Sequence, residues 1–296
     1  MSFARSPLQT GAGTAGSGAE ATADSDTAPA ESDAAGLLGP DDPPVVEPVN
    51  PSGRAPVLVI ADHAGNAVPG ALDGLGLGAT ALERHVAYDI GAAWMARRLA
   101  ERLDAPGLIH RYSRLIIDPN RDTDDPTSIC AISDGIVVPG NRRLTADDAR
   151  RRAAVFHAPY HAAIEAAIDG FRRRGVAPAI VSVHSFTPAL RTHIPRPWHI
   201  GVLWGEDGRI ALPLMAGLAA DGTVTVGDNE PYDARNSHGY TIERHALPPG
   251  LPNVLLETRQ DLIATRPEAE AWADRIADAL APVLSDETLY RPFREA

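Results

Sequence analysis

Short runs of β-branched and other apolar residues recur along this chain, separated by segments with helical periodicity. The clearest run is Pro56-Val-Leu-Val-Ile-Ala61, and further strands are expected at 108–117, 179–183, 198–204, 223–226 and 253–256. Apolar runs without polar alternation are typical of strands buried on both faces. Helices are expected over 80–103, 145–174 and 268–284. This alternation predicts an α/β fold, with a mixed, mainly parallel sheet covered by helices on both faces.

The first 50 residues differ in composition from the rest of the chain. They are rich in Ala, Gly, Ser, Thr, Asp, Glu and Pro, and they carry eight acidic residues and one arginine. A segment with so few large apolar side chains cannot bury enough surface to offset the entropy of ordering it. We therefore expect residues 1–50 to be a disordered acidic tail and residues 51–296 to form a single α/β domain.

The charged residues and the single cysteine exclude several classes of function. All 27 basic residues are arginine, which rules out a lysine Schiff base or a Walker-A phosphate loop. The net charge of −12 offers no basic surface for nucleic acid. No apolar run is long enough to span a bilayer, and no signal peptide is apparent. Because the lone Cys130 fits a reducing compartment, we expect a soluble cytoplasmic protein with neither nucleic-acid nor membrane partners.

Reactive residues follow the predicted strands where each strand ends. Functional side chains in open α/β sheets collect just past the carboxyl ends of strands. Neutral imidazole is a good Zn²⁺ ligand, and a catalytic zinc needs only three protein ligands and a water molecule. A single histidine at a strand end is more often structural, so the prediction of a metal-dependent hydrolase depends on the combination. The segments are Asp62-His63-Ala-Gly-Asn66, Arg114 with Asp118-Pro-Asn120-Arg121, His184-Ser-Phe-Thr-Pro188 and Glu257-Thr-Arg259.

Five short motifs follow one another along the chain. The first is His63-Ala-Gly-Asn66 with Pro69 three residues later. The others are Ser113-Arg114-Leu115, Asp118-Pro119-Asn120-Arg121, Val183-His184-Ser185-Phe186-Thr187-Pro188 and Leu256-Glu257-Thr258-Arg259. Together they resemble the N-formylglutamate amidohydrolase family, over about residues 56–284. That family is a branch of the zinc carboxypeptidase-like, or phosphorylase/hydrolase-like, fold. The resemblance implies zinc-dependent hydrolysis of N-formyl-L-glutamate or a related small acidic N-acyl amino acid.

The resemblance also implies a set of metal ligands. His63 and His184 would be the histidine ligands of one Zn²⁺ ion. Asn66 stands where the carboxypeptidase pattern His-x-x-Glu has its glutamate ligand. Because an amide oxygen is a poorer zinc ligand than a carboxylate, Asp89 and Asp62 are the alternatives to Asn66.

The remaining roles implied by the resemblance concern catalysis and substrate binding. Glu257 would be the general base, and Arg114 would stabilise the oxyanion. Asn120 and Arg121 would hold a substrate carboxylate, because the planar guanidinium matches carboxylate geometry. A glutamate-like substrate has a second carboxylate, for which Arg191 and Arg244 are open choices.

Other interpretations stay open at this point. The same machinery would serve a carboxypeptidase-like enzyme or a general N-acyl amino acid deacylase. The loss of the ligand glutamate at Asn66 also leaves room for a non-catalytic binding protein. His157 and His161, four residues apart on a predicted helix, are interpreted as structural packing. His85 and Asp89, also four apart, are interpreted as an ordinary helix-face pair.

Overall fold

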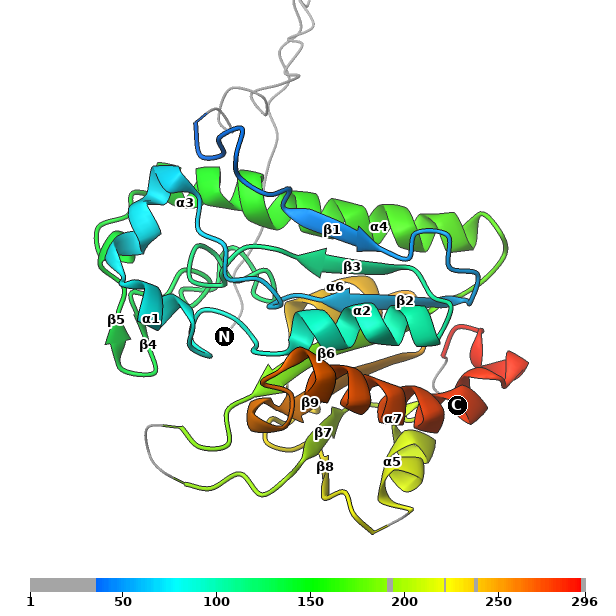
Figure 1. The fold of residues 1–296 in the computed structure, drawn as a ribbon. Helices are drawn as coiled ribbons and strands as arrows, with labels where there is room; N and C mark the ends of the chain where they lie inside the picture. The colour runs from blue at the N-terminus through cyan, green and yellow to red at the C-terminus, as the bar shows by residue number, and fades with distance from the viewer. Residues whose placement is uncertain (1–35, 191–193, 221, 237–238, 294–296) are drawn as a thin grey trace, which may run out of the picture.

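A computed structural model describes residues 36–190, 194–220, 222–236 and 239–293. Within them, one seven-stranded sheet has the order β1-β3-β2-β6-β9-β7-β8 (Figure 1). Strands β3, β2, β6 and β9 run parallel, β1 and β7 run antiparallel to their neighbours β3 and β9, and β8 is parallel to β7. The strands are β1 (Val46–Val49), β2 (Val57–Ala61), β3 (Gly107–His110), β6 (Ala179–Phe186), β7 (Ile200–Leu203), β8 (Val226–Asp228) and β9 (Asn253–Arg259). The predicted α/β fold with a mixed, mainly parallel sheet is confirmed.

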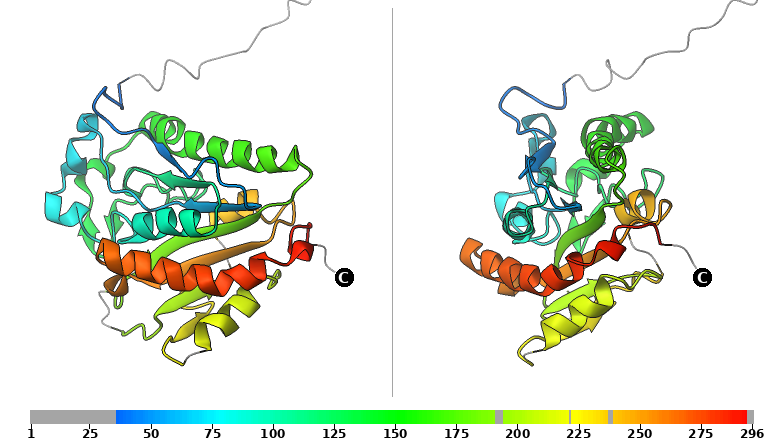
Figure 2. Two further views of the ribbon diagram at one scale, coloured as in Figure 1. Left: turned by 45° about the vertical axis from the view of Figure 1, so that its right-hand side comes forward. Right: turned by 90° about the vertical axis from the view of Figure 1, so that its right-hand side faces the viewer.

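Helices cover both faces of this sheet, as the strand sequences predict. Val57 and Val59 of β2 pack against one set of helices, which are α2 (Ala92–Arg102), α5 (Ala211–Ala219) and α7 (Arg266–Leu284). Leu58 and Ile60, between them in the chain, pack toward α4 (Ala158–Arg172) and α6 (Tyr240–His245). Successive side chains of a strand point to opposite faces, so a continuous apolar run fills both cores. Figure 2 shows α2 and α7 on one side of the sheet and α4 and α6 on the other.

The remaining elements are short. Strands β4 (Ile132–Ser133) and β5 (Ile136–Val137) form a separate hairpin. The others are α1 (Ala79–Leu82), α3 (Ala146–Arg152), the π-helical turn η3 (Ala153–His157), and the 3₁₀ turns η1 (Gly70–Gly76), η2 (Pro139–Asn141), η4 (Gln260–Leu262) and η5 (Glu287–Leu289). Among the described residues, no helix is long and apolar enough to cross a bilayer.

The folded domain begins earlier than the predicted boundary at residue 51. Strand β1 pairs with β3, with Val46 opposite His110. Leu37 and Val45 are also buried in an apolar cluster. The run Val-Val-Glu-Pro-Val at 45–49 is enough to add an edge strand, a position that tolerates proline. The predicted tail therefore includes a structured part, and its residues 1–35 lie outside the described residues.

The helix predicted over 80–103 is interrupted between α1 and α2. Gly91 precedes α2 with φ +83°, and a Cβ there would lie 2.2 Å from the backbone oxygen of Ile263. Only glycine fits this conformation and this close approach. The predicted helix-face pair of His85 with Asp89 is therefore wrong: His85 pairs with Asp134 at 3.1 Å, and Asp89 turns toward the sheet.

The helix predicted over 145–174 is divided into α3, the π-helical turn η3 and α4. Thr145 and Asp148 form a capping box at its start. The π-helical turn η3 follows α3, and α4 resumes with Pro159 in its first turn. Proline lacks a backbone N–H, so its place directly after the π-turn explains the division of the helix.

Candidate metal centre and its pocket

Three neighbouring strands of the sheet bring the predicted site residues together at their carboxyl ends. His63 lies two residues beyond β2, His184 lies near the end of β6, and Glu257 lies in β9. In the pairing of β6 with β9, His184 stands directly opposite Glu257. Side chains at opposite positions of paired strands share one face, so the histidine and the carboxylate are neighbours. The predicted meeting of these segments at one sheet edge is seen in the structure.

Only a glycine fits at position 65, in the loop after β2. A Cβ at this position would lie 1.9 Å from the backbone oxygen of Arg111, in the segment after β3. Any side chain would therefore force apart the two loops that follow β2 and β3. The close approach positions His63 against the Arg111–Asp118 segment.

His63, Asp89 and His184 form a buried group that can hold a metal ion. One donor atom from each lies within 4.8 Å of the others. Asp89 Oδ2 is 3.0 Å from His184 Nδ1 and 3.5 Å from His63 Nδ1. Two imidazoles and one carboxylate match the donor set of many catalytic zinc sites. The structure brings together both predicted histidines and the alternative ligand Asp89.

Two further carboxylates hold the other nitrogen of each ring. His63 Nε2 lies 2.6 Å from Asp118 Oδ1, and His184 Nε2 lies 3.1 Å from Asp62 Oδ2. A carboxylate behind a histidine fixes the proton on that nitrogen and frees the opposite lone pair for a metal. Both Nδ1 atoms face Asp89, so the orientations of the two rings fit a bound divalent ion. Asp62, an alternative ligand in the sequence interpretation, takes this supporting position instead.

The buried charges of the group stabilise one another. Burial alone would raise the pKa of Asp62, but hydrogen bonding and the charge of His184 lower it to about 2. Burial alone would also raise the pKa values of Asp89 and Asp118. His63 lowers that of Asp89, and Arg114 followed by His63 lowers that of Asp118. These carboxylates are therefore ionised at neutral pH, as metal ligands and their supporting groups need to be.

Glu257 differs from the other buried carboxylates of the site because none of the described cationic side chains forms an ion pair with it. It is 7% exposed, and its Oε2 atom is buried without a hydrogen-bond partner among the described residues. Burial, opposed by the charge of His184, raises the pKa of Glu257 to about 7. A carboxyl group that exchanges its proton near neutral pH is suited to general acid–base catalysis.

Arg114 borders the metal group through its ion pairs. Its Nη2 atom donates to Asp118 Oδ2 at 2.5 Å, and Nη1 lies 3.7 Å from Asp89 Oδ1. The side chain is 29% exposed, so part of the guanidinium faces the pocket. The predicted oxyanion-stabilising residue thus lies beside the proposed ligands.

Asn66 is engaged elsewhere, away from this group. Its Nδ2 atom donates to the backbone oxygen of Leu82 at 3.2 Å and to Glu83 Oε1 at 3.4 Å. These contacts tie the loop after β2 to the end of α1. Asp89 rather than Asn66 lies beside the two histidines, because the break before α2 turns that carboxylate inward.

Asn120 and Arg121 take different positions in the same loop. The Asn120 side chain accepts a hydrogen bond from the backbone N–H of Thr241 at 2.9 Å, which ties the loop to α6. Arg121 is half-exposed, lies 3.8 Å from Asp125 and lines the pocket beside the metal group. Arg121 therefore lines the cavity, whereas Asn120 ties the loop to α6.

Neither open choice for a second carboxylate-binding arginine is placed at the site. Arg191 lies outside the described residues. Arg244 donates to Glu165 Oε1 at 2.7 Å and to the hydroxyl of Tyr240 at 2.7 Å, and it lines a separate surface hollow.

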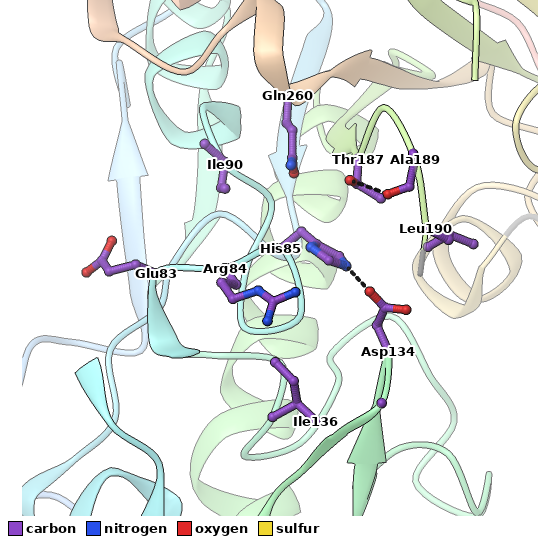
Figure 3. A pocket seen from close by; sticks show the side chains of 11 residues that line it. Glu83, Arg84, His85, Ile90, Asp134, Ile136, Thr187, Ala189, Leu190 and Gln260 are labelled. Carbon is purple, nitrogen blue, oxygen red and sulfur yellow. Dashed lines mark hydrogen bonds and ion pairs between the residues drawn. The ribbon is translucent and has the colours of Figure 1, made fainter. Parts of the chain in front are cut away.

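Of two adjoining cavities, the inner one borders the metal group at Asp89. The inner cavity, of about 390 Å³, is lined by Asp89, Arg114, Asp118 and Arg121 among others. The outer cavity, of about 670 Å³, opens beside it (Figure 3). The two share His85, Asp134, Thr187 and Leu190 as lining residues. Figure 3 shows the His85–Asp134 ion pair across the outer cavity, with Gln260 above it. The inner cavity is large enough for a small amino acid derivative.

Three histidines that the sequence interpretation assigned to packing, or left without a role, support the Arg121 loop. His161 Nε2 lies 2.9 Å from the backbone oxygen of Pro119, and His157 Nε2 lies 3.0 Å from that of Arg121. His245 Nε2 lies 2.8 Å from His161 Nδ1. The i, i+4 spacing of the first two was visible in the sequence, but their partners lie 36 and 42 residues away.

The chain is similar in sequence and in fold to known proteins. The sequence profile of the family described as N-formylglutamate amidohydrolase matches residues 55–264. A gene product of Agrobacterium tumefaciens of known structure is 32% identical, with a TM-score of 0.80 over 84% of this chain and 98% of its own. An N-formylglutamate amidohydrolase from Ralstonia eutropha has a similar fold, with 22% identity and a TM-score of 0.55 over 80% of this chain and 98% of its own.

No curated protein sequence matches the chain. The family profile covers well over half of the chain, including His63, Asp89, His184 and Glu257. This protein therefore belongs to the N-formylglutamate amidohydrolase family.

Proposed function

We propose that this protein is a zinc-dependent amidohydrolase that cleaves N-formyl-L-glutamate or a closely related N-acyl amino acid. The products are formate, or the corresponding acid, and the free amino acid. The observation that carries the proposal is the buried, unpartnered Oε2 of Glu257 beside the His63–Asp89–His184 group. Membership of the amidohydrolase family supports the reaction class.

The ligand set that we propose is His63, Asp89 and His184, with Asp89 in place of Asn66. When bound there, Zn²⁺ supplies a Lewis acid that polarises the substrate carbonyl and makes water a better proton donor. Asp62 and Asp118 keep the two imidazoles oriented and neutral at Nδ1. These supporting carboxylates place the ligand atoms before any substrate arrives.

Glu257 moves the proton during the reaction. Its carboxylate accepts a proton from the attacking water as the water oxygen bonds to the acyl carbon. The carboxyl group then delivers that proton to the amide nitrogen, the C–N bond breaks, and the free amine leaves. Each turnover consumes one water, and Glu257 ends in its initial state. The raised pKa of about 7 lets Glu257 serve in both steps near neutral pH.

The two arginines beside the group bind negative charges of the substrate. Arg114, held by Asp118, directs its exposed N–H groups toward the pocket and stabilises the negative charge on the carbonyl oxygen. Arg121 binds a substrate carboxylate from the wall of the inner cavity. Asn120 contributes by holding the Arg121 loop against α6.

The test is an assay of the purified full chain on N-formyl-L-glutamate, with N-acetyl-L-glutamate and N-formyl-L-methionine as alternatives. We expect hydrolysis of N-formyl-L-glutamate that stops with a chelator and returns with zinc. Comparable rates on all three substrates would instead indicate a general N-acyl amino acid deacylase. No hydrolysis of any of them by the zinc-loaded protein would contradict the proposal.

Replacing Glu257 tests the assigned base. Glu257→Gln keeps the size of the side chain but cannot accept a proton, so kcat should fall by about 10²–10⁴-fold. The zinc content should stay at one ion per chain, because Glu257 is not a proposed ligand. Half-exposed Glu270, paired with Arg266 on α7, provides the matched control, and Glu270→Gln should keep the wild-type kcat. A near-normal kcat in Glu257→Gln would show that another group is the base.

A further inference from the structure

Arg196 lies beside the candidate site without an acidic partner among the described residues. Its Nη1 atom donates to the hydroxyl of Tyr232 at 3.3 Å and to the backbone oxygen of Thr187 at 3.4 Å. Its guanidinium also lies 5.2 Å from the ring centroid of Tyr232 and 5.8 Å from that of Phe186. Since Arg has five N–H donors, these contacts with described residues use only a small part of its hydrogen-bonding capacity.

The contacts of Arg196 place it at the rim of the inner cavity. Thr187, Phe186 and Tyr232 all line that cavity, together with Asp89 and Arg114. Partial burial and the negative charge of Glu257 raise the pKa of the Tyr232 hydroxyl. The hydroxyl that contacts Arg196 is therefore within the electrostatic field of the proposed base.

The sheet topology places Arg196 and Arg121 on different flanks of the metal group. In the strand order, β3 lies on one side of β2, β6 and β9, and β7 lies on the other. Arg121 follows β3. Arg196 precedes β7, which is antiparallel to β9, so its beginning lies at the carboxyl end of β9, with Ile200 opposite Thr258. Both arginines thus reach the same edge of the sheet from different sides.

Two aromatic rings prepare Arg196 to bind an anion. Stacking on Tyr232 and Phe186 restricts the guanidinium without neutralising its charge. Other half-exposed arginines of the chain already pair with carboxylates, as Arg98 does with Asp274 and Arg244 with Glu165. A planar guanidinium with free donors matches a carboxylate in geometry and charge.

We propose that Arg196, held by Tyr232 and Phe186, forms a second carboxylate subsite that gives this enzyme its preference for N-acyl amino acids with an acidic side chain. The inference rests on the proposed function and deepens it. Arg121 binds one carboxylate of the substrate, and Arg196 binds the other. The proposal assigns to Arg196 the role that the sequence left open between Arg191 and Arg244.

The experiment compares N-formyl-L-glutamate with N-formyl-L-glutamine, which has nearly the same shape but a neutral side chain. For the wild type we expect a clear preference for the glutamate substrate in kcat/KM. In Arg196→Gln the ratio of the two kcat/KM values should fall by about 10- to 100-fold, mainly through KM for the charged substrate. Arg196→Lys should retain part of the preference, because it keeps the charge but loses the planar fork.

Arg244→Gln is the matched control, because Arg244 is paired with Glu165 outside the cavities. Its ratio of kcat/KM values should equal that of the wild type. An unchanged ratio in Arg196→Gln, or a collapsed ratio in Arg244→Gln, would overturn the inference.

Binding separates this inference from the proposed reaction. The affinity of the zinc-loaded protein for L-glutamate and for L-glutamine is measured by calorimetry in wild type and Arg196→Gln. A loss of affinity in the variant that is confined to L-glutamate supports the subsite even if no formyl substrate is hydrolysed. Equal affinities for L-glutamate in the two proteins would contradict the subsite even if N-formyl-L-glutamate is hydrolysed.

Discussion

Asp62 accepts hydrogen bonds from three side chains that come from different parts of the chain. The hydroxyl of Tyr160 donates to it at 2.8 Å, that of Thr241 at 3.1 Å, and His184 Nε2 lies 3.1 Å away. It is fully buried, so its charge depends on these partners. Through them, α4 and α6 contribute to the orientation of a histidine that belongs to β6.

Replacing Asp62 by Asn should weaken metal binding. The neutral amide accepts the His184 N–H less strongly and also presents an NH₂ group, so the ring loses its fixed tautomer. We expect zinc affinity to fall by about 10- to 100-fold. Competition with a chromogenic chelator measures it, and the exposed Asp169→Asn is the control. Equal zinc affinities in wild type and Asp62→Asn would assign Asp62 a purely structural role.

The sequence identified the right kinds of residue here but not their individual roles. Asp62 and His63 are adjacent in the chain, so both were candidates for the same metal. Their side chains point in different directions, and Asp62 therefore supports His184 while Asp118 supports His63. Which carboxylate binds a metal and which one supports a histidine depends on directions that spacing along the chain does not contain.

At the scale of elements, α4 and α6 hold the loop that carries Arg121. Three consecutive backbone oxygens, of Pro119, Asn120 and Arg121, face His161, the N–H of Tyr240 and His157. Burial lowers the pKa of His161 to about 3 and that of His245 to about 4. Both rings are thus neutral at pH 7, and His161 Nε2 donates its proton to the Pro119 oxygen.

The neutral state of His161 predicts a loss of stability in acid. In the unfolded chain a histidine binds a proton near pH 6.5, whereas the folded chain resists protonation of His161 until about pH 3. The unfolded state therefore binds more protons in this window, and stability decreases as pH falls through it. This one group contributes up to about 1.4 kcal/mol per pH unit.

Urea unfolding of metal-free protein at pH 7, 6, 5 and 4 measures this effect. His161→Gln retains an N–H donor for the Pro119 oxygen but does not titrate, so its unfolding free energy should vary less steeply with pH than that of the wild type. Identical slopes in wild type and His161→Gln would show that His161 does not contribute to the acid sensitivity.

The break between α1 and α2 shows the limit of periodicity at this scale. Apolar residues continue at helical spacing through 80–103, which predicts one helix. The backbone of Ile263, from a segment more than 150 residues away, lies against Gly91 and interrupts it. The third proposed ligand, Asp89, owes its position to this contact.

For the whole molecule, the proposed metal group joins three distant segments of the chain. His63, Asp89 and His184 come together only when β2, β6 and the segment before α2 are folded. A ligand that binds only the native state raises its stability by mass action. A metal at this site would therefore stabilise the domain as a whole.

Zinc added to chelator-treated protein should raise its melting temperature. At a zinc concentration about 1,000 times Kd the stabilisation is about 4 kcal/mol, which for a domain of this size corresponds to roughly 8 °C or more. Differential scanning fluorimetry measures the shift. Asp89→Asn should lose most of this rise in melting temperature, whereas Asp278→Asn, at an exposed position, should show the full rise. The same shift in Asp89→Asn as in wild type would exclude Asp89 as a ligand.

The amino-acid sequence by itself determined the α/β class, most of the central strands, and the arrival of His63, His184 and Glu257 at strand ends. Motif order also identified the family. These features are local, since a short run of neighbouring residues indicates both a buried strand and the residue at its end.

Only the tertiary structure decided that Asp89 rather than Asn66 joins the histidines, that Asp62 and Asp118 lie behind them, and that the folded part begins before residue 51. Each of these depends on which distant segments come into contact. A helix break, an edge strand and a supporting hydrogen bond are all stabilised by partners elsewhere in the chain, so no local pattern contains them.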